Sequence, residues 1–212
     1  MTQRHAVGLA PKLLRRPVRV LNTADAAEVF AHPRPQLARL VAAGVLHRLA
    51  GGFYAVVPQE FTGVPWRPGL EAAAGGVAAV VFGSDNAVVM GLSAARLHGV
   101  VPRAVASGLV AVPRQHRPIR LLDRDARVVF VARDVARLDA EMVDTELGRL
   151  LVTGAEQTAL DLARRPDLGS AADQVREAAQ VLWSRCDPLT VDRIAGEQRL
   201  RSAARRLREW VG

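Results

Sequence analysis

The apolar residues at positions 26–30 predict a short helix of about two turns that buries one side. Asn22 or Thr23 can cap its N-terminus, because either side-chain oxygen can accept a hydrogen bond from a free amide of the first turn. Asp25 lies in that first turn, where the helix dipole favours a negative charge. The His32-Pro33 step ends the helix, since the residue before a proline disfavours the α-helical region.

A second helix is predicted from Pro33 or Arg34 to Ala43. Proline is tolerated in the first turn, where its missing N–H group costs no intrahelical hydrogen bond. The side chains of Leu37, Leu40 and Val41 form one apolar stripe, which predicts that this face is buried. Gly44 follows the helix at the position where a C-terminal cap belongs.

The next ten residues, HRLAGGFYAV at 47–56, predict a β-hairpin. Glycine readily adopts the positive φ angles of a two-residue hairpin loop, and Gly51-Gly52 separates two strand-like segments. A two-residue loop pairs Ala50 with Phe53, Leu49 with Tyr54 and His47 with Val56. An isolated hairpin of this size is marginally stable in water. We therefore expect it to pack on the preceding helices through Leu49 and Tyr54.

The order helix, tight turn, helix and hairpin is that of a winged helix-turn-helix, in which the hairpin is the wing. A further helix is expected over residues 8–16. We therefore predict a winged helix domain over residues 1–57. Residues 58–68 are rich in proline and glycine and predict an interdomain linker, so that a second domain occupies residues 69–212.

The second domain mixes helical and β-type segments. Residues 70–82 predict a helix, or a helix that runs into a short buried strand, and residues 84–98 predict a helix capped by Ser84. Three runs rich in β-branched residues predict strands at 108–114, 126–133 and 141–148. Helices are expected at 155–165, 170–186, 188–196 and 199–211, and the last, basic and amphipathic, should dock on its own domain. The predicted fold class is thus α+β, a winged helix followed by a mixed α/β domain that ends in helices.

Composition narrows the class of protein and its partners. Half of the 212 residues are hydrophobic but 4% are aromatic, which predicts a core of alanine, valine and leucine. The formal net charge of +8 favours an anionic partner such as nucleic acid. Nearly all of the positive charge is arginine, a bias that a GC-rich genome would also produce. A single cysteine excludes a disulfide framework and fits a cytoplasmic protein, for which we expect neither a signal peptide nor a membrane span.

DNA contacts are expected from the second helix and the hairpin. Arginine can bind guanine through two N–H groups, glutamine can bind adenine, and both side chains also reach phosphates. The candidates are, on the second helix, Arg34, Gln36 and Arg39; on the hairpin, His47 and Arg48; and in the segment that precedes Asn22, Arg15, Arg16 and Arg19. The alternative for each is an ordinary solvated surface position.

The residue patterns give no indication of a catalytic or metal site. Asp144 and Glu146 could share one face of a predicted strand, but a nuclease of the restriction type would normally need a nearby lysine, and Lys12 is the only one. The five histidines are scattered, and His98 is interpreted as a helix-terminal residue. Cys186 is interpreted as a buried or incidental thiol. We therefore expect no cofactor, no metal and no catalytic residue.

Three stretches, taken in order, resemble the AbiEi-type antitoxins of type IV toxin–antitoxin systems, including their mycobacterial relatives. The first match, LARLVAAGVLHRLAGGFYAV, resembles the family's recognition helix, G-x-L-x-R-L, glycine and aromatic-Tyr-Ala pattern. The second, SDNAVVMGLSAARLHGV, resembles its Ser-x-x-Ser/Ala-Ala-x-x-x-x-Gly-Leu helix, and the third, LLVTGAEQTALDLA, resembles its V-T-x-x-E-R-T-L-L-D-L-A segment. Gln157 departs from this pattern, since arginine is common there, and the recognition turn carries Pro33 and Pro35.

The resemblance implies an antitoxin that represses its own operon by binding double-stranded promoter DNA through the winged helix. It also implies that the second domain neutralises a nucleotidyltransferase-like toxin encoded beside it. We expect the protein not to be an enzyme, with a toxin-modifying activity as the open alternative. Another alternative is a one-component winged-helix regulator whose second domain senses a ligand and which has no toxin partner. The operator, the oligomeric state and the mode of neutralisation stay open.

Overall fold

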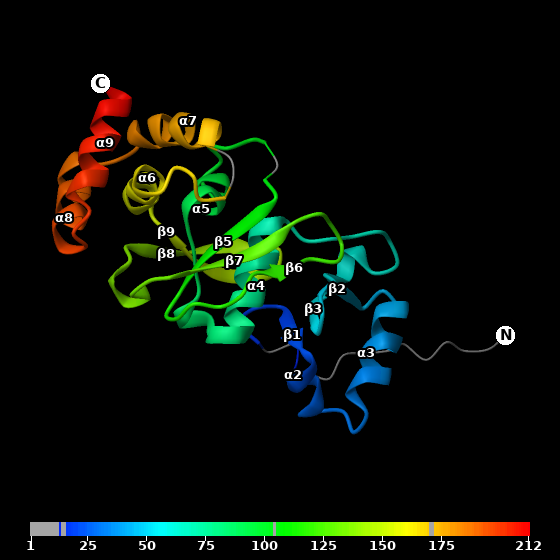
Figure 1. Ribbon diagram of the computed structural model, residues 1–212. Helices are drawn as coiled ribbons and strands as arrows, with labels where there is room; N and C mark the ends of the chain where they lie inside the picture. The colour runs from blue at the N-terminus through cyan, green and yellow to red at the C-terminus, as the bar shows by residue number, and fades with distance from the viewer. Residues whose placement is uncertain (1–12, 14–15, 104, 170–171) are drawn as a thin grey trace.

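The computed structural model describes residue 13 and residues 16–103, 105–169 and 172–212 (Figure 1). Apart from Leu13 and Arg16, the helix expected over residues 8–16 lies outside the described residues, and so does the candidate residue Arg15. The chain is a mixed α+β protein, as predicted, with one small and one large β-sheet.

The N-terminal part, residues 16–57, contains a three-stranded antiparallel sheet and two helices. The strand order is β1 (Val20–Asn22), β3 (Phe53–Val56) and β2 (Leu46–Ala50), and the helices are α2 (Thr23–Ala27) and α3 (Pro33–Ala42). Asn22 caps α2 and exchanges hydrogen bonds with Asp25, a capping box. Gly44 follows α3 with a φ of 70°, as predicted for its C-terminal cap, so both predicted helices are present. The expectation that the His32-Pro33 step ends the first helix is wrong, because α2 already ends at Ala27.

The hairpin departs from the predicted register at Leu49. Ala50 pairs with Phe53 as expected, but a β-bulge at Leu49 makes Arg48 the partner of Tyr54 and His47 the partner of Ala55. The pairs predicted between Leu49 and Tyr54 and between His47 and Val56 are therefore wrong. One extra residue reverses the alternation of side chains along a strand. Tyr54 packs with the helices, as expected, whereas Leu49 is fully buried on the other face, against the C-terminal part.

A mixed six-stranded sheet organises the C-terminal part, residues 69–212. Its strand order is β6 (Ile119–Arg120), β7 (Arg127–Ala132), β5 (Ser107–Val112), β4 (Val88–Val89), β9 (Gly148–Thr153) and β8 (Ala140–Thr145). One face packs on α4 (Leu70–Phe82). The other face packs on α5 (Gly91–Leu97) and α6 (Ala155–Arg164), which α7 (Ala172–Trp183), α8 (Pro188–Glu197) and α9 (Arg201–Val211) cover in turn (Figure 1).

Most predicted elements of this part are present, but one predicted helix is wrong, and the sequence patterns do not predict strands β6 and β9. The three predicted strands correspond to β5, β7 and β8, and the four C-terminal helices to α6–α9. Residues 70–82 form one helix without a strand. The helix predicted from Ser84 is wrong, because residues 84–86 form a 3-10 turn, β4 follows, and α5 begins only at Gly91. The buried residues Ala203, Ala204 and Leu207 confirm that the last helix docks on its own domain.

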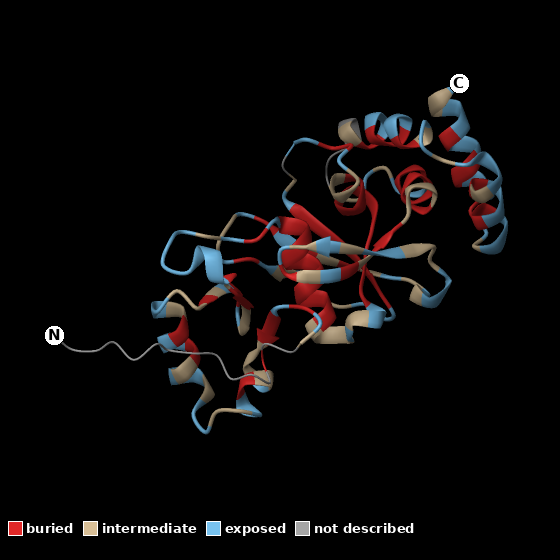
Figure 2. Ribbon diagram, turned by 180° about the vertical axis from the view of Figure 1, so that it is seen from behind, coloured by how far each residue is buried: buried red, intermediate tan, exposed pale blue. Residues whose placement is uncertain are grey.

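The N-terminal sheet is packed directly against the C-terminal part. Val20, Leu49 and Ala55 belong to the same buried cluster as α4, which Figure 2 shows as buried along most of its length. Backbone hydrogen bonds reinforce the contact: Arg19 N–H donates to Leu147 O at 2.7 Å, and Leu122 N–H donates to Leu49 O at 2.8 Å. The boundary predicted at residues 58–68 stays a prediction, but one apolar core extends across it.

Every helix among the described residues falls short of the length and apolarity that crossing a membrane requires.

Replacing Gly76 by alanine should destabilise the protein by about 1–3 kcal/mol, because overpacking a well-filled core forces neighbouring atoms to move. A Cβ atom at Gly76 would lie 2.4 Å from Cγ2 of Val20, between α4 and β1. Gly196→Ala in α8 is the matched control. Apart from the adjacent residues and backbone of its own helix, no atom lies within 4 Å of its added Cβ, so a gain of up to about 1 kcal/mol is expected. Urea unfolding followed by circular dichroism measures both, and equal stability of the two variants would contradict tight packing of α4 on β1.

Candidate functional site

The outer face of α3 carries two exposed arginines, Arg34 and Arg39. Leu37 and Leu40 are fully buried on the opposite face and hold the helix on the small sheet. Neither arginine side chain forms a hydrogen bond or ion pair within the part of the chain that the structure describes. Gln36 is half-buried at the flank of this face. Two guanidinium groups on one helix are therefore free to bind an external partner.

The other candidate DNA-binding residues lie on several different elements. Arg48 is exposed on β2, the strand that packs beside α3. Arg19 is also exposed, but it precedes β1, at the opposite edge of the three-stranded sheet. Arg16 forms an ion pair with Asp25 at 2.8 Å. The structure thus brings Arg34, Gln36, Arg39 and Arg48 to neighbouring elements, whereas Arg19 lies at the opposite edge of the small sheet and Arg16 is paired with α2.

His47 points away from that surface and toward the C-terminal part. Its Nε2 lies 2.8 Å from Oδ2 of Asp123, and its ring makes an edge contact with Trp66. Arg124 binds the same carboxylate through two nitrogens, at 2.8 and 3.1 Å. Burial alone would raise the pKa of Asp123, but the hydrogen bonds from Arg124 and His47 lower it below its ordinary value. These contacts fasten the hairpin to the large sheet.

A second polar centre lies in the C-terminal part, around the fully buried side chain of Asp161 on α6. Its Oδ1 accepts hydrogen bonds from Nη1 of Arg133 at 2.8 Å and from Nε2 of Gln157 at 3.3 Å. Burial raises the pKa of Asp161, and Arg133 offsets that rise only in part. The guanidinium group beside Asp161 belongs to Arg133, just after β7.

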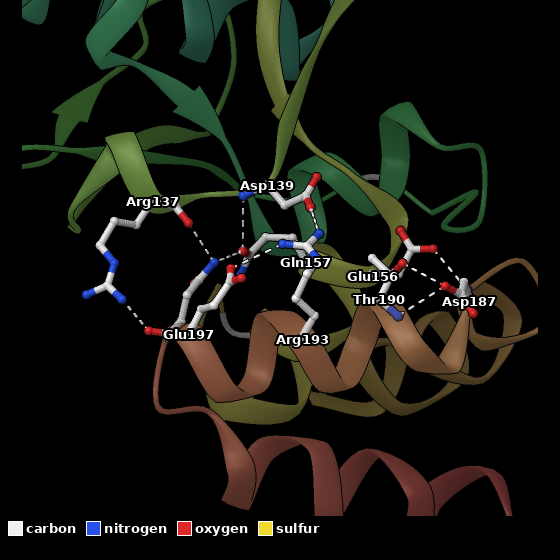
Figure 3. Close-up of polar contacts among 9 residues, drawn as sticks. Arg137, Asp139, Glu156, Gln157, Asp187, Thr190, Arg193 and Glu197 are labelled. Atoms are coloured by element: carbon white, nitrogen blue, oxygen red, sulfur yellow. Dashed lines mark hydrogen bonds and ion pairs between the residues drawn. The ribbon is translucent and has the colours of Figure 1, made fainter.

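Gln157 extends this centre toward α8 (Figure 3), where Gln198 is the C-cap residue. Gln157 Oε1 accepts hydrogen bonds from Gln198 Nε2 at 2.5 Å and from the backbone N–H of Asp139 at 3.3 Å. Arg193 bridges Asp139 and Glu197, at 2.8 and 3.1 Å. The contacts hold α8 against the segment between β7 and β8.

At the other end of α8, Asp187 caps the helix (Figure 3). Its carboxylate accepts hydrogen bonds from the backbone N–H groups of Leu189 and Thr190, and its own N–H donates to Glu156 of α6 at 3.0 Å. Hydrogen bonds from Thr190 and Leu189 lower the pKa of Asp187. Both ends of α8 are thus tied to neighbouring elements by polar contacts.

The other residues that the sequence analysis considered for catalysis or metal binding do not lie together in one site. Asp144 lies on β8 near Arg149, whereas Glu146 lies in the following turn and accepts a hydrogen bond from the backbone of Gly69. His98 is the C-cap residue of α5, as interpreted. Burial raises the pKa of the Cys186 thiol to about 12, so it is unreactive near neutral pH. The described residues contain no group of three or more His, Cys, Asp or Glu side chains suited to a metal.

Replacing Arg133 by methionine should destabilise the protein by about 3–5 kcal/mol near pH 8, because the buried Asp161 carboxylate loses its cation. The loss should be smaller near pH 5. Burial already raises the pKa of Asp161, and losing Arg133 raises it further, so the folded protein takes up a proton as the pH falls. Adding Asp161→Asn should restore part of the stability. Urea unfolding at both pH values measures the free energy of unfolding of each variant. A loss of stability that is the same at both pH values would contradict the proposed role of the Asp161 charge.

Comparison with known proteins places these features in a family. The sequence matches the family described as AbiEi antitoxin C-terminal domain over residues 86–212, which is more than half of the chain. The crystal structure of the RV2827C protein from Mycobacterium tuberculosis is similar, with a TM-score of 0.57 and 17% sequence identity, and the match covers 95% of this chain and 78% of that chain. At this identity the likeness concerns the fold alone. The comparison with curated proteins gives no match. By the match over residues 86–212, the chain belongs to the AbiEi antitoxin family.

Proposed function

We propose that this protein is the antitoxin of a toxin–antitoxin pair, that it neutralises a nucleotidyltransferase-like toxin, and that it represses its own operon by binding promoter DNA. The family match over residues 86–212 carries the antitoxin role. It favours this reading over a one-component regulator that senses a ligand and has no toxin partner. The proposed class of the toxin and the proposed autorepression rest on the resemblance described in the sequence analysis.

The order and packing of elements in the N-terminal part support DNA binding by a winged helix-turn-helix. Helices α2 and α3, joined by a tight turn, precede the hairpin of β2 and β3, and β1 completes the small sheet. In such domains the second helix enters the major groove. Helix α3 lies at the end of the molecule remote from α7–α9, so its outer face is accessible to a long partner (Figure 1).

We assign the base contacts to Arg34 and Arg39, because their guanidinium groups are exposed on the outer face of α3 and have no partner among the described residues. Gln36 would contact DNA from the flank of the helix. Arg48 suits a phosphate or minor-groove contact from the hairpin. The contact of His47 with Asp123 favours a positioning role for this residue over a DNA contact. Arg19, and Arg15 and Arg16 with it, would at most add phosphate contacts.

Arg34→Ala and Arg39→Ala should each weaken binding to the DNA upstream of the gene by about 1–3 kcal/mol if the residue reads a base. Arg201→Ala on α9 removes the same charge at the opposite end of the molecule and should change the affinity little. Fluorescence anisotropy at several salt concentrations measures both the affinity and its expected steep fall with salt. Absence of binding at low salt, or an equal effect of all three variants, would refute the proposed surface.

The full-length double variant Arg34→Ala/Arg39→Ala should still rescue growth of cells that express the toxin from an independent promoter. The reason is that the family match lies in the C-terminal part, whereas both substitutions lie on the exposed face of α3. A promoter–reporter fusion in the same cells should show lost repression. If the variant is expressed at the normal level but fails to rescue growth, neutralisation depends on the DNA-binding surface.

A further inference from the structure

We propose that the C-terminal part binds a phosphate group that carries a proton, either inorganic phosphate or a phosphomonoester, between Asp161 and the arginines Arg133, Arg164 and Arg165. A cavity of about 60 Å³ lies there, between the end of β7 and the last turns of α6. Besides these four polar residues, its lining includes the apolar side chains of Met90 and Leu168.

The carboxylate of Asp161 needs a hydrogen-bond donor that the described chain does not provide. Arg133 and Gln157 both bind Oδ1, whereas the buried Oδ2 has no hydrogen-bond partner among the described residues. Burial favours the protonated form of Asp161, but the ion pair with Arg133 at 2.8 Å favours the carboxylate, which is the form that would bind the ligand. A carboxylate only accepts hydrogen bonds, and buried polar atoms are seldom left without a partner. A ligand of this cavity should therefore offer an O–H or N–H group to Oδ2.

The arginines of the same cavity need an acceptor. The guanidinium groups of Arg164 and Arg165 form no hydrogen bond or ion pair with any described residue. The pKa of Arg164 is lowered, first by its partial burial and then by the nearby charge of Arg133. The C-terminal end of α6 contributes roughly half of a negative charge. That does not cancel the excess of three arginines over one aspartate, so the cavity also favours an anion.

A protonated phosphate satisfies both requirements in one molecule. Its P–OH group can donate to Oδ2 of Asp161, while its other oxygens accept hydrogen bonds from the planar guanidinium groups, which suit phosphate geometry. The second ionisation of a phosphate monoester has a pKa of about 6, so the proton is available near neutral pH. Sulfate and the phosphodiesters of nucleic acid carry no such proton. Asp161 should therefore repel them, and the site is distinct from the proposed DNA surface on α3.

Isothermal titration calorimetry on the full chain, at about pH 6 and constant ionic strength, tests this site. The probes are inorganic phosphate, O-phosphoserine, sulfate and dimethyl phosphate. Inorganic phosphate should bind at least about tenfold more tightly than sulfate and dimethyl phosphate, since a charged hydrogen bond is worth about that factor or more. Phosphoserine binding as tightly as phosphate would identify a monoester site, and weaker phosphoserine binding would identify a site for the free ion.

Arg164→Ala and Arg165→Ala should each weaken phosphate binding by about tenfold or more. Arg117→Ala removes the same charge at another exposed position and should leave the affinity unchanged. Asp161→Asn replaces an acceptor by an amide donor, so sulfate should then bind nearly as well as phosphate. If that variant does not fold, the phosphate affinities of the two arginine variants and the selectivity of the unmodified protein test the proposal. No phosphate binding at millimolar concentration, equal affinity for phosphate and sulfate, or unchanged affinity in both arginine variants would overturn the proposal.

Discussion

The packing of β1 and the hairpin on α4 is the contact on which the arrangement of the molecule depends. The small sheet has α2 and α3 on one face and α4 on the other, so it belongs to two cores at once. Gly76 lets α4 approach β1 closely, and the bulge at Leu49 places that side chain on the face that meets the C-terminal part. The position of α3 relative to the large sheet follows from these contacts, since residues 58–68 alone would leave it undefined.

Charged groups reinforce this arrangement where apolar packing ends. The ring of His47 and the guanidinium group of Arg124 meet at Asp123, beside the covered face of the hairpin. On the other face of the large sheet, the ion pair between Arg133 and Asp161 links the end of β7 to α6. A half-satisfied buried carboxylate is costly, so its retention in the core is easier to understand if a bound group completes its hydrogen bonds.

The features predictable from the sequence are those determined by residues close together in the chain. Asn22 and Gly44 mark helix ends by their own chemistry, and Leu37 and Leu40 lie one turn apart, so α2, α3 and the exposure of Arg34 and Arg39 could be inferred. The bulge at Leu49 could not, because that side chain is buried against the C-terminal part, which is distant in sequence. Val88 and Val89 form a strand only because β5 and β9 flank them. Likewise Asp161 lies within a recognisable motif, but its partner Arg133 is 28 residues away, and Asp123 is 76 residues from His47.

The shared core also determines what a break in the backbone would do. Residues 59–67 are mostly exposed, and this segment is accessible to proteases. A chain nicked there would keep its two fragments together without a covalent link, because separating them would expose the apolar surfaces of α4 and of the small sheet to water. By the same reasoning, the fragments expressed as separate polypeptides could reassemble, whereas either one alone would tend to aggregate.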